Sequence, residues 1–185
     1  MTHQSYHDKM ISELNRRHFD ITKHRVYISD SEYIATFPLY TMDGKFVGYQ
    51  HYRPDCNKTK GNSPKDGRYF TYRKKEVWVP WGMESYYFNN GPVFITEGIF
   101  DACRLTNHGA TALATLTNNP PVDFLNFLSF LHRPIISVLD NDPAGKKLAK
   151  CGDYVETVPQ GDLGDSDESY VHYLLTKYKT NLTQN

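Results

Sequence analysis

Long apolar runs and paired cysteines are both missing from this chain of 185 residues. No stretch of about eighteen consecutive apolar residues occurs, so we expect no membrane-spanning helix. The polar opening MTHQSYHDKM lacks the apolar core of a secretory signal, which favours a cytoplasmic location. Three cysteines, Cys56, Cys103 and Cys151, are far apart and form no C-x-x-C pair. By themselves they cannot build a zinc ribbon or a dense disulfide framework.

Net charge is also missing, because 21 Lys and Arg residues balance 21 Asp and Glu residues. The charges are nevertheless unevenly distributed along the chain. Residues 51–75 are mostly basic, whereas residues 140–168 are mostly acidic. One chain therefore offers a basic surface and an acidic one, as an enzyme needs when it holds a polyanion beside a metal ion.

The first half of the chain has the pattern of a small α+β lobe. Apolar spacing predicts an amphipathic helix over residues 5–18, within an N-terminal helical extension at 1–30. Residues 31–90 contain short extended runs separated by turn signals, and Asp43-Gly44 predicts a hairpin. The segments YFTYR and EVWVPW are strand-like, and the polar interval before them, PDCNKTKGNSPKDGR, indicates an exposed loop.

The second half, residues 91–180, alternates apolar runs with helical patterns. The expected strands are PVFIT, ATALATL, PIISVLD and YVETVP, and helical patterns follow each of them. This rhythm predicts an α/β domain with a mostly parallel sheet and flanking helices. Functional side chains of such sheets lie at the carboxyl ends of the strands.

Acidic residues stand where two of these predicted strands end. VFIT runs into Glu97, and IISVL runs into Asp140-Asn141-Asp142. Residues i and i+2 of an extended backbone face the same way, so Asp140 and Asp142 can direct two carboxylates at one point. Mg²⁺ prefers oxygen ligands of this kind. A further acidic group begins at Asp165, after the fourth predicted strand.

Each acid also has a purely structural interpretation. Asp142 precedes Pro143, and an acid before a first-turn proline is an ordinary helix N-cap. Glu97 is likewise placed to cap the helix that follows it. The combination of an acid-Gly pair after one strand and Asp-x-Asp after another favours a shared functional site over two separate caps.

These segments resemble Toprim domains. VFITEGIFDACRL is similar to their glutamate motif, and SVLDNDPAGKKLAK is similar to their Asp-x-Asp motif with its trailing glycine, Gly145. E-G-x-x-D-A followed by D-x-D-x-A-G is the form found in phage and bacterial DNA primases. GDLGDSDESYVHYLL resembles a further acidic motif of those enzymes, with Asp165 matching best. The resemblance extends over residues 33–175, because GYQHYRPD and GRYFTYR are similar to the basic half of a primase RNA polymerase core.

The resemblance implies a metal-dependent synthesis of short RNA primers on a single-stranded DNA template. Glu97, Asp140 and Asp142 would be catalytic, and together with Asp165 they would hold Mg²⁺ or Mn²⁺. A primer 3′-hydroxyl would attack the α-phosphate of a nucleoside triphosphate. Basic residues, interleaved with aromatic ones, would bind the template and the nucleotides. The expected binding residues are Arg53, Lys58, Lys60, Lys65, Arg68, Arg73 and Lys146.

The sequence departs from that family in two respects. It carries no amino-terminal zinc ribbon, and it has no Gly-x-x-x-x-Gly-Lys-Ser/Thr loop of a fused helicase. A replicative helicase or a separate template-recognition protein is therefore an expected partner. Two alternatives remain open: a Toprim nuclease or nicking enzyme that uses the same acids, and a non-catalytic Toprim protein that binds nucleic acid.

Overall fold

The computed structural model describes residues 5–57, 63–75 and 77–182, and these form two compact units. The first unit comprises residues up to Val77, and the second begins at Trp78. The sequence predicts a Toprim domain over residues 91–180. Residues from Trp78 onward join the second unit because the Trp81 backbone pairs with Ala114 and the Ser85 hydroxyl donates to the Ala112 carbonyl.

The first unit consists of a helix and an antiparallel sheet. Helix α1 (Tyr6–Arg16) lies within the helix predicted from apolar spacing, and Ser5 caps its first turn. The described strands of the first unit form a sheet in the order β1-β2-β3-β4. Their bounds are β1 (Tyr27–Ile28), β2 (Ala35–Tyr40), β3 (Phe46–Tyr52) and β4 (Tyr69–Arg73), with a short 3₁₀ turn, η1 (Pro64–Asp66), before β4.

The hairpin between β2 and β3 is confirmed, since these strands pair antiparallel on either side of Asp43-Gly44. One face of the sheet forms the core of this unit. The side chains of Phe37 and Leu39 are fully buried there, and the Phe37 ring lies 4.9 Å from that of Phe19. The Tyr52 hydroxyl donates to Glu13 of α1 at 2.6 Å, which attaches the helix to β3.

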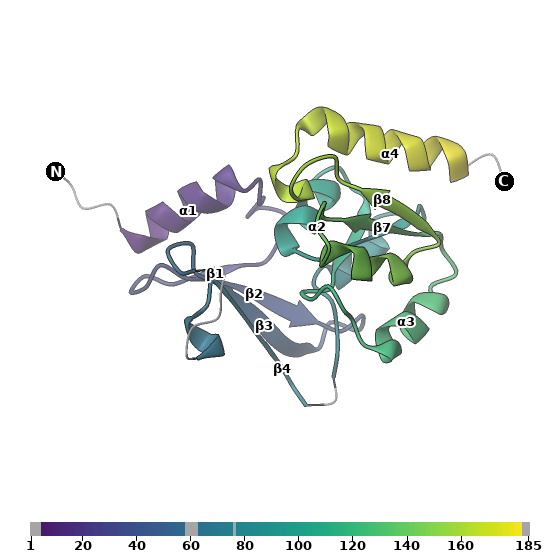
Figure 1. Ribbon diagram of the computed structural model, residues 1–185. Coiled ribbons are helices and arrows are strands. Elements are labelled where there is room, and N and C mark those ends of the chain that lie inside the picture. The colour runs from purple at the N-terminus through teal and green to yellow at the C-terminus, as the bar shows by residue number, and fades with distance from the viewer. Residues whose placement is uncertain (1–4, 58–62, 76, 183–185) are drawn as a thin grey trace. The chain divides into compact units, whose positions relative to one another are not determined.

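The second unit is an α/β structure, in which β7, β8 and helices α2, α3 and α4 are labelled in Figure 1. Its described strands form a four-stranded, fully parallel sheet in the order β6-β5-β7-β8. The strands are β5 (Val93–Thr96), β6 (Thr111–Ala114), β7 (Ile135–Leu139) and β8 (Tyr154–Thr157). Every residue of β5, β6 and β7 is buried, as expected for a parallel sheet covered on both faces. The predicted fold class of this half is therefore confirmed as a parallel sheet with flanking helices.

Helices and 3₁₀ turns connect the parallel strands. Helix α2 (Ile99–Thr106) follows β5, α3 (Val122–Ser129) follows β6, and α4 (Glu168–Leu182) ends the described chain. The 3₁₀ segments are η2 (Met83–Tyr87), η3 (Gly145–Cys151) and η4 (Leu163–Asp165). Helix α4 packs on the sheet through the ring of Tyr178, which meets Phe94 of β5 edge to face.

One local prediction was wrong. The segment EVWVPW is not a strand, because Val77 to Pro80 have no regular structure and Trp81 makes only an isolated bridge. The segment after β7 is helical as predicted, and its helix, η3, is of the 3₁₀ type. None of the helices in the described ranges is both long and apolar enough to cross a membrane.

Candidate functional site

Acidic residues from three adjacent strands gather at the carboxyl edge of the parallel sheet. Glu97 directly follows β5, and Asp140 directly follows β7, which pairs with β5. Asp162 caps η4, on the segment that follows β8. Asp101 lies in the first turn of α2. The parallel register therefore brings acids from distant parts of the sequence to one edge of the sheet.

The charges of these acids affect one another. Burial raises the pKa of Glu97, and the negative charge of Asp142 raises it further. Burial also raises the pKa of Asp101 to about 8, with added contributions from the charges of Asp162 and Asp140. Each acid is therefore close enough to another to oppose its ionisation, and this crowding is typical of functional sites.

Asp101 is the most deeply buried member of the cluster, at 6% exposure. Its two carboxyl oxygens accept hydrogen bonds from the backbone N–H groups of Gly98 (3.0 Å) and Gly164 (2.7 Å). A Cβ atom at Gly98 would lie 2.6 Å from Asp101 Oδ2, so a larger residue there would displace the Asp101 carboxylate. Asp101 thus joins the start of α2 to the segment that carries Asp162 and Asp165.

Asp142 has the capping contact that its position before a proline indicates. Its Oδ1 atom accepts a hydrogen bond from Gly145 N–H at 2.6 Å, at the start of η3. Gly145 is needed for close packing, because a Cβ atom there would lie 2.6 Å from the Asp140 carbonyl oxygen. Capping and a functional role are compatible in Asp142, since its charge also acts on Glu97.

The third acidic group contains two acids close together in the sequence. Asp165, which the sequence predicts as a site residue, is exposed. Asp162 is half-buried, accepts a hydrogen bond from Asp165 N–H at 2.9 Å, and is the residue whose charge acts on Asp101. Neither Asp101 nor Asp162 was among the predicted site residues. The signal for Asp101 was its place as the second acid of the E-G-x-x-D motif.

The donor set of this cluster fits a hard divalent cation. It consists of carboxylates alone, which suit Mg²⁺ or Mn²⁺ and not a softer metal. In the described ranges, no three of these carboxylates bring an oxygen each within 4.8 Å of one another. Mg²⁺ tolerates such spacing because water and substrate phosphates complete its coordination.

The predicted nucleotide-binding residues of the first unit lie around β3 and β4. The Arg53 and Arg68 segments run side by side, since Arg53 N–H donates to the Arg68 carbonyl at 2.8 Å. Within the described residues, Arg53 Nη1 is buried without a hydrogen-bond partner. Burial lowers the pKa of Arg73 to about 10. Lys65 is exposed on η1, whereas Lys58 and Lys60 lie outside the described residues.

Aromatic rings line the face of the same sheet opposite the core. Tyr49 faces Tyr72 and His51 faces Phe70 across the β3–β4 pair, with ring centroids 5.4 and 6.2 Å apart. The Tyr49 and His51 rings lie 4.6 Å from each other, so the four rings are contiguous. All four side chains are at least partly exposed. Contiguous exposed rings of this kind can stack on unpaired bases.

Lys146 belongs to the second unit and is exposed on η3, next to Gly145 and three residues after Pro143. Asp142 accepts a hydrogen bond from Gly145, the residue before Lys146, so Lys146 lies on the same turn as an acid of the cluster. A phosphate bound at the carboxyl edge of the sheet would lie within the field of both charges.

A parallel sheet with flanking helices and acids at its carboxyl edge is consistent with a Toprim domain. Comparison with solved structures specifies the fold more closely. The chain matches the RNA polymerase domain of Mycobacterium tuberculosis primase DnaG with a TM-score of 0.60 and 18% identity, over 89% of this chain and 62% of that one. It matches the primase fragment of the bacteriophage T7 primase-helicase with a TM-score of 0.52 and 14% identity, over 78% and 62%.

A DnaG primase catalytic domain bound to single-stranded DNA also shares the fold, with a TM-score of 0.55 and 18% identity over 77% of this chain and 52% of that chain. The chain spans about half the length of several of the solved chains it resembles. A scan of protein-family models and a search of curated proteins both found no match. The fold is thus that of DnaG-type primase catalytic cores.

Proposed function

We propose that this chain is the catalytic core of a phage-type DNA primase, a nucleotidyltransferase that synthesises short RNA primers on single-stranded DNA. The observation that carries the proposal is the cluster of mutually repelling acids at the carboxyl edge of β5 and β7, in a fold shared with primase cores. A fold alone does not specify an activity, so the site has to support the assignment.

In this proposal Asp140, Asp142 and Asp165 hold Mg²⁺ or Mn²⁺, and Glu97 lies next to the primer hydroxyl. The bound ion supplies charge stabilisation for the attacking and leaving oxygens. The 3′-oxygen forms a bond to the α-phosphorus, and the bond to pyrophosphate breaks. Glu97 accepts the hydroxyl proton, a role that its raised pKa favours because a general base works best with a pKa near the working pH.

Asp101 acts as a positioning residue. Its hydrogen bonds to Gly98 and Gly164 hold the residue after Glu97 against the loop that carries Asp162. Accurate placement of reacting groups accounts for much of the catalysis of phosphoryl transfer, so a shift at Gly98 would displace Glu97. Removal of Asp101 should therefore lower the rate of synthesis without removing a metal ligand.

The first unit supplies the grip on template and triphosphates in this proposal. Its cations, with Lys146 of the second unit, neutralise phosphates, and the rings of Tyr49, His51, Phe70 and Tyr72 stack on template bases. Arg53 fits this role well, because its buried Nη1 has no hydrogen-bond partner among the described residues. A replicative helicase or a separate template-recognition protein would supply unwinding and initiation specificity.

The decisive experiment incubates the purified chain with single-stranded DNA, labelled ribonucleotides and Mg²⁺ or Mn²⁺. We expect short RNA products that vanish in Asp140→Ala and persist in Asp123→Asn, a control that changes an exposed acid on α3. Cleavage of the DNA without RNA synthesis would replace the proposal with a nuclease. DNA binding without either reaction, also in the presence of a replicative helicase, would favour a non-catalytic protein.

A further inference from the structure

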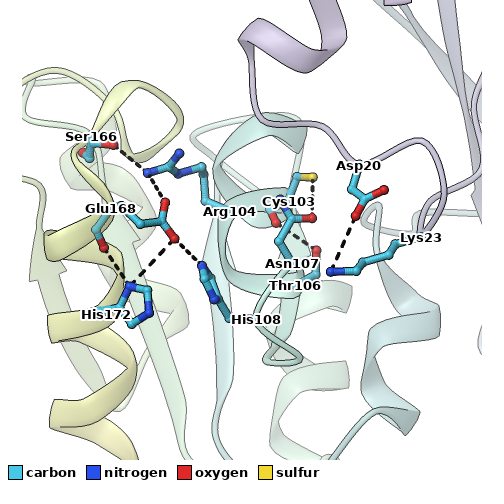
Figure 2. Close-up of polar contacts among 10 residues, drawn as sticks. All are labelled: Asp20, Lys23, Cys103, Arg104, Thr106, Asn107, His108, Ser166, Glu168 and His172. Carbon is cyan, nitrogen blue, oxygen red and sulfur yellow. Dashed lines mark hydrogen bonds and ion pairs between the residues drawn. The ribbon is translucent and has the colours of Figure 1, made fainter.

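A second group of potential metal ligands, which shares no residue with the acidic edge, lies where the end of α2 meets the start of α4 (Figure 2). His108 follows the last turn of α2, and Glu168 and His172 lie one turn apart on α4. Each of the three residues offers a ligand atom, and these atoms all lie within 4.8 Å of one another. Among the described residues, this is the one group of three His, Cys, Asp or Glu side chains whose ligand atoms lie this close together.

The Glu168 carboxylate is the centre of this group. Its Oε1 atom lies 2.5 Å from His108 Nε2 and 3.8 Å from His172 Nδ1. Its Oε2 atom pairs with Arg104 at 3.0 Å, as Figure 2 shows. Arg104 is only 3% exposed and also donates to the Ser166 carbonyl at 2.7 Å. A buried guanidinium therefore fixes the carboxylate so that its other oxygen faces both histidines.

The two rings are also oriented by the fold. Residues i and i+4 of a helix lie on the same face, which brings His172 beside Glu168. His172 Nδ1 lies 3.0 Å from the Glu168 carbonyl oxygen, and the His108 and His172 ring centroids are 4.7 Å apart. Both rings keep exposed surface, so small side-chain rotations can bring the three ligand atoms to coordination distance of one ion.

We propose that His108, Glu168 and His172 form a binding site for a divalent transition-metal ion of the zinc class, which joins α4 to the end of α2. Two imidazole nitrogens and one carboxylate oxygen suit Zn²⁺, with water in the fourth position, and they do not suit Mg²⁺. The Arg104 contact supports the ligand in the way that outer hydrogen bonds orient metal-bound carboxylates. This site is chemically distinct from the acidic edge and does not depend on primase activity.

Zinc titration of the full chain after removal of metal with EDTA tests the site. Calorimetry should detect one bound Zn²⁺ ion in the wild type. The affinity for Zn²⁺ should fall at least about tenfold in each of the single variants His108→Ala and His172→Ala, and should stay unchanged in His132→Asn. His132 is an exposed histidine elsewhere in the same unit, and its positive φ of 50° is a conformation that asparagine accepts. Equal affinities in all four proteins would overturn the proposal.

Two further measurements separate the site from general effects on folding and from the acidic edge. Hydrogen exchange at the first turns of α4 should slow on addition of Zn²⁺ in the wild type and in Asp140→Asn, and remain unchanged in His108→Ala. Mg²⁺ at the same concentration should leave α4 unchanged. A zinc effect on α4 that is lost in Asp140→Asn and kept in His108→Ala would place the ion at the acidic edge and contradict the proposal.

Discussion

Glu13 of the first unit and the acids at the carboxyl edge of the parallel sheet have opposite surroundings. In the first unit, Glu13 accepts hydrogen bonds from Arg16 at 2.7 Å and from the Tyr52 hydroxyl at 2.6 Å. Burial opposes its ionisation, but these partners outweigh that effect and lower the pKa of Glu13. In the second unit, burial raises the pKa of Glu97 and Asp101, and the charges of neighbouring acids raise it further.

This difference separates acids that stabilise the folded chain from acids that destabilise it. A carboxylate paired with a cation and a hydroxyl stabilises the folded chain, whereas buried carboxylates that repel one another destabilise it. Side chains that conflict with folding are expected where function requires them. The comparison therefore points to the second unit, and to the carboxyl edge of its sheet, as the place where negative charge is used.

The largest expected effect is the loss of activity in Asp140→Asn. RNA synthesis should fall at least about a hundredfold, which corresponds to about 2.7 kcal/mol of barrier. The free energy of unfolding should stay unchanged or rise, because one repelling charge is removed. Primer-synthesis rates and urea denaturation of the same preparations measure both quantities. Glu13→Gln is the matched variant of the first unit, and a loss of synthesis as large as that of Asp140→Asn would break the comparison.

Removal of the paired acid should have the reverse profile. Glu13→Ala removes the carboxylate that accepts the hydrogen bond of the Tyr52 hydroxyl, and Tyr52 is 3% exposed. Removal of one partner of a buried hydrogen bond costs about 1–3 kcal/mol, so the free energy of unfolding should fall by that amount. Urea denaturation checks this value. The double variant Glu13→Ala/Tyr52→Phe should recover part of the loss, and a double variant less stable than Glu13→Ala would contradict the assigned role of the hydrogen bond.

The pH dependence of stability should have opposite signs in the two regions. The pKa of Asp101 is about 8 in the folded chain against an ordinary value of 3.8, so the folded state binds its proton more tightly. Its contribution to stability is therefore lost as pH rises from about 4 to about 8. The pKa of Glu13 is lowered, so its contribution is present above the ordinary value of 4.5 and is lost as pH falls below it.

Melting temperatures between pH 3 and pH 9, without divalent ions, test these signs. Asp101→Asn should flatten the decline on the alkaline side, and Glu13→Gln should flatten the decline on the acid side. Asp123→Asn, a change of an exposed acid, should leave the profile as in the wild type. An Asp101→Asn profile that declines as steeply as the wild type between pH 5 and pH 8 would show that the pKa of Asp101 is not raised in the folded chain.

The smallest expected effect concerns the cations of the first unit. Affinity for single-stranded DNA should fall steeply with salt, and Lys65→Ala should reduce the magnitude of the slope of log affinity against log salt by roughly 0.7. Lys9→Ala, at an exposed lysine on α1, should leave the slope unchanged. Fluorescence anisotropy at several salt concentrations measures both variants. A wild-type affinity that is independent of salt would contradict the proposal that the basic residues bind the DNA phosphates.

The parallel sheet could be predicted from the sequence because its strands are continuous apolar runs. VFIT and IISVL are buried on both faces, and each run ends in an acid, so both the fold class and the positions of Glu97 and Asp140 followed from local patterns. The hairpin at Asp43-Gly44 followed from its turn residues in the same way.

Features that depend on tertiary contacts could not be predicted. EVWVPW has the composition of a strand, but its only described pairing is the contact of Trp81 with Ala114, more than thirty residues away along the chain. Asp101 has the local pattern of an ordinary first-turn acid, and its hydrogen bond to Gly164 depends on the packing of η4 against α2. The same holds for His108 and Glu168, which meet only when α4 packs beside α2.

Binding of Mn²⁺ to the acidic edge tests the central claim most directly. Electron paramagnetic resonance of Mn²⁺ titrated into the chain, in a His108→Ala/His172→Ala background that removes the proposed zinc site, counts the bound ions. We predict a bound ion in this background, and its loss when Asp140→Asn and Asp142→Asn are added. Mn²⁺ binding that is equally strong with and without these two carboxylates would contradict the account.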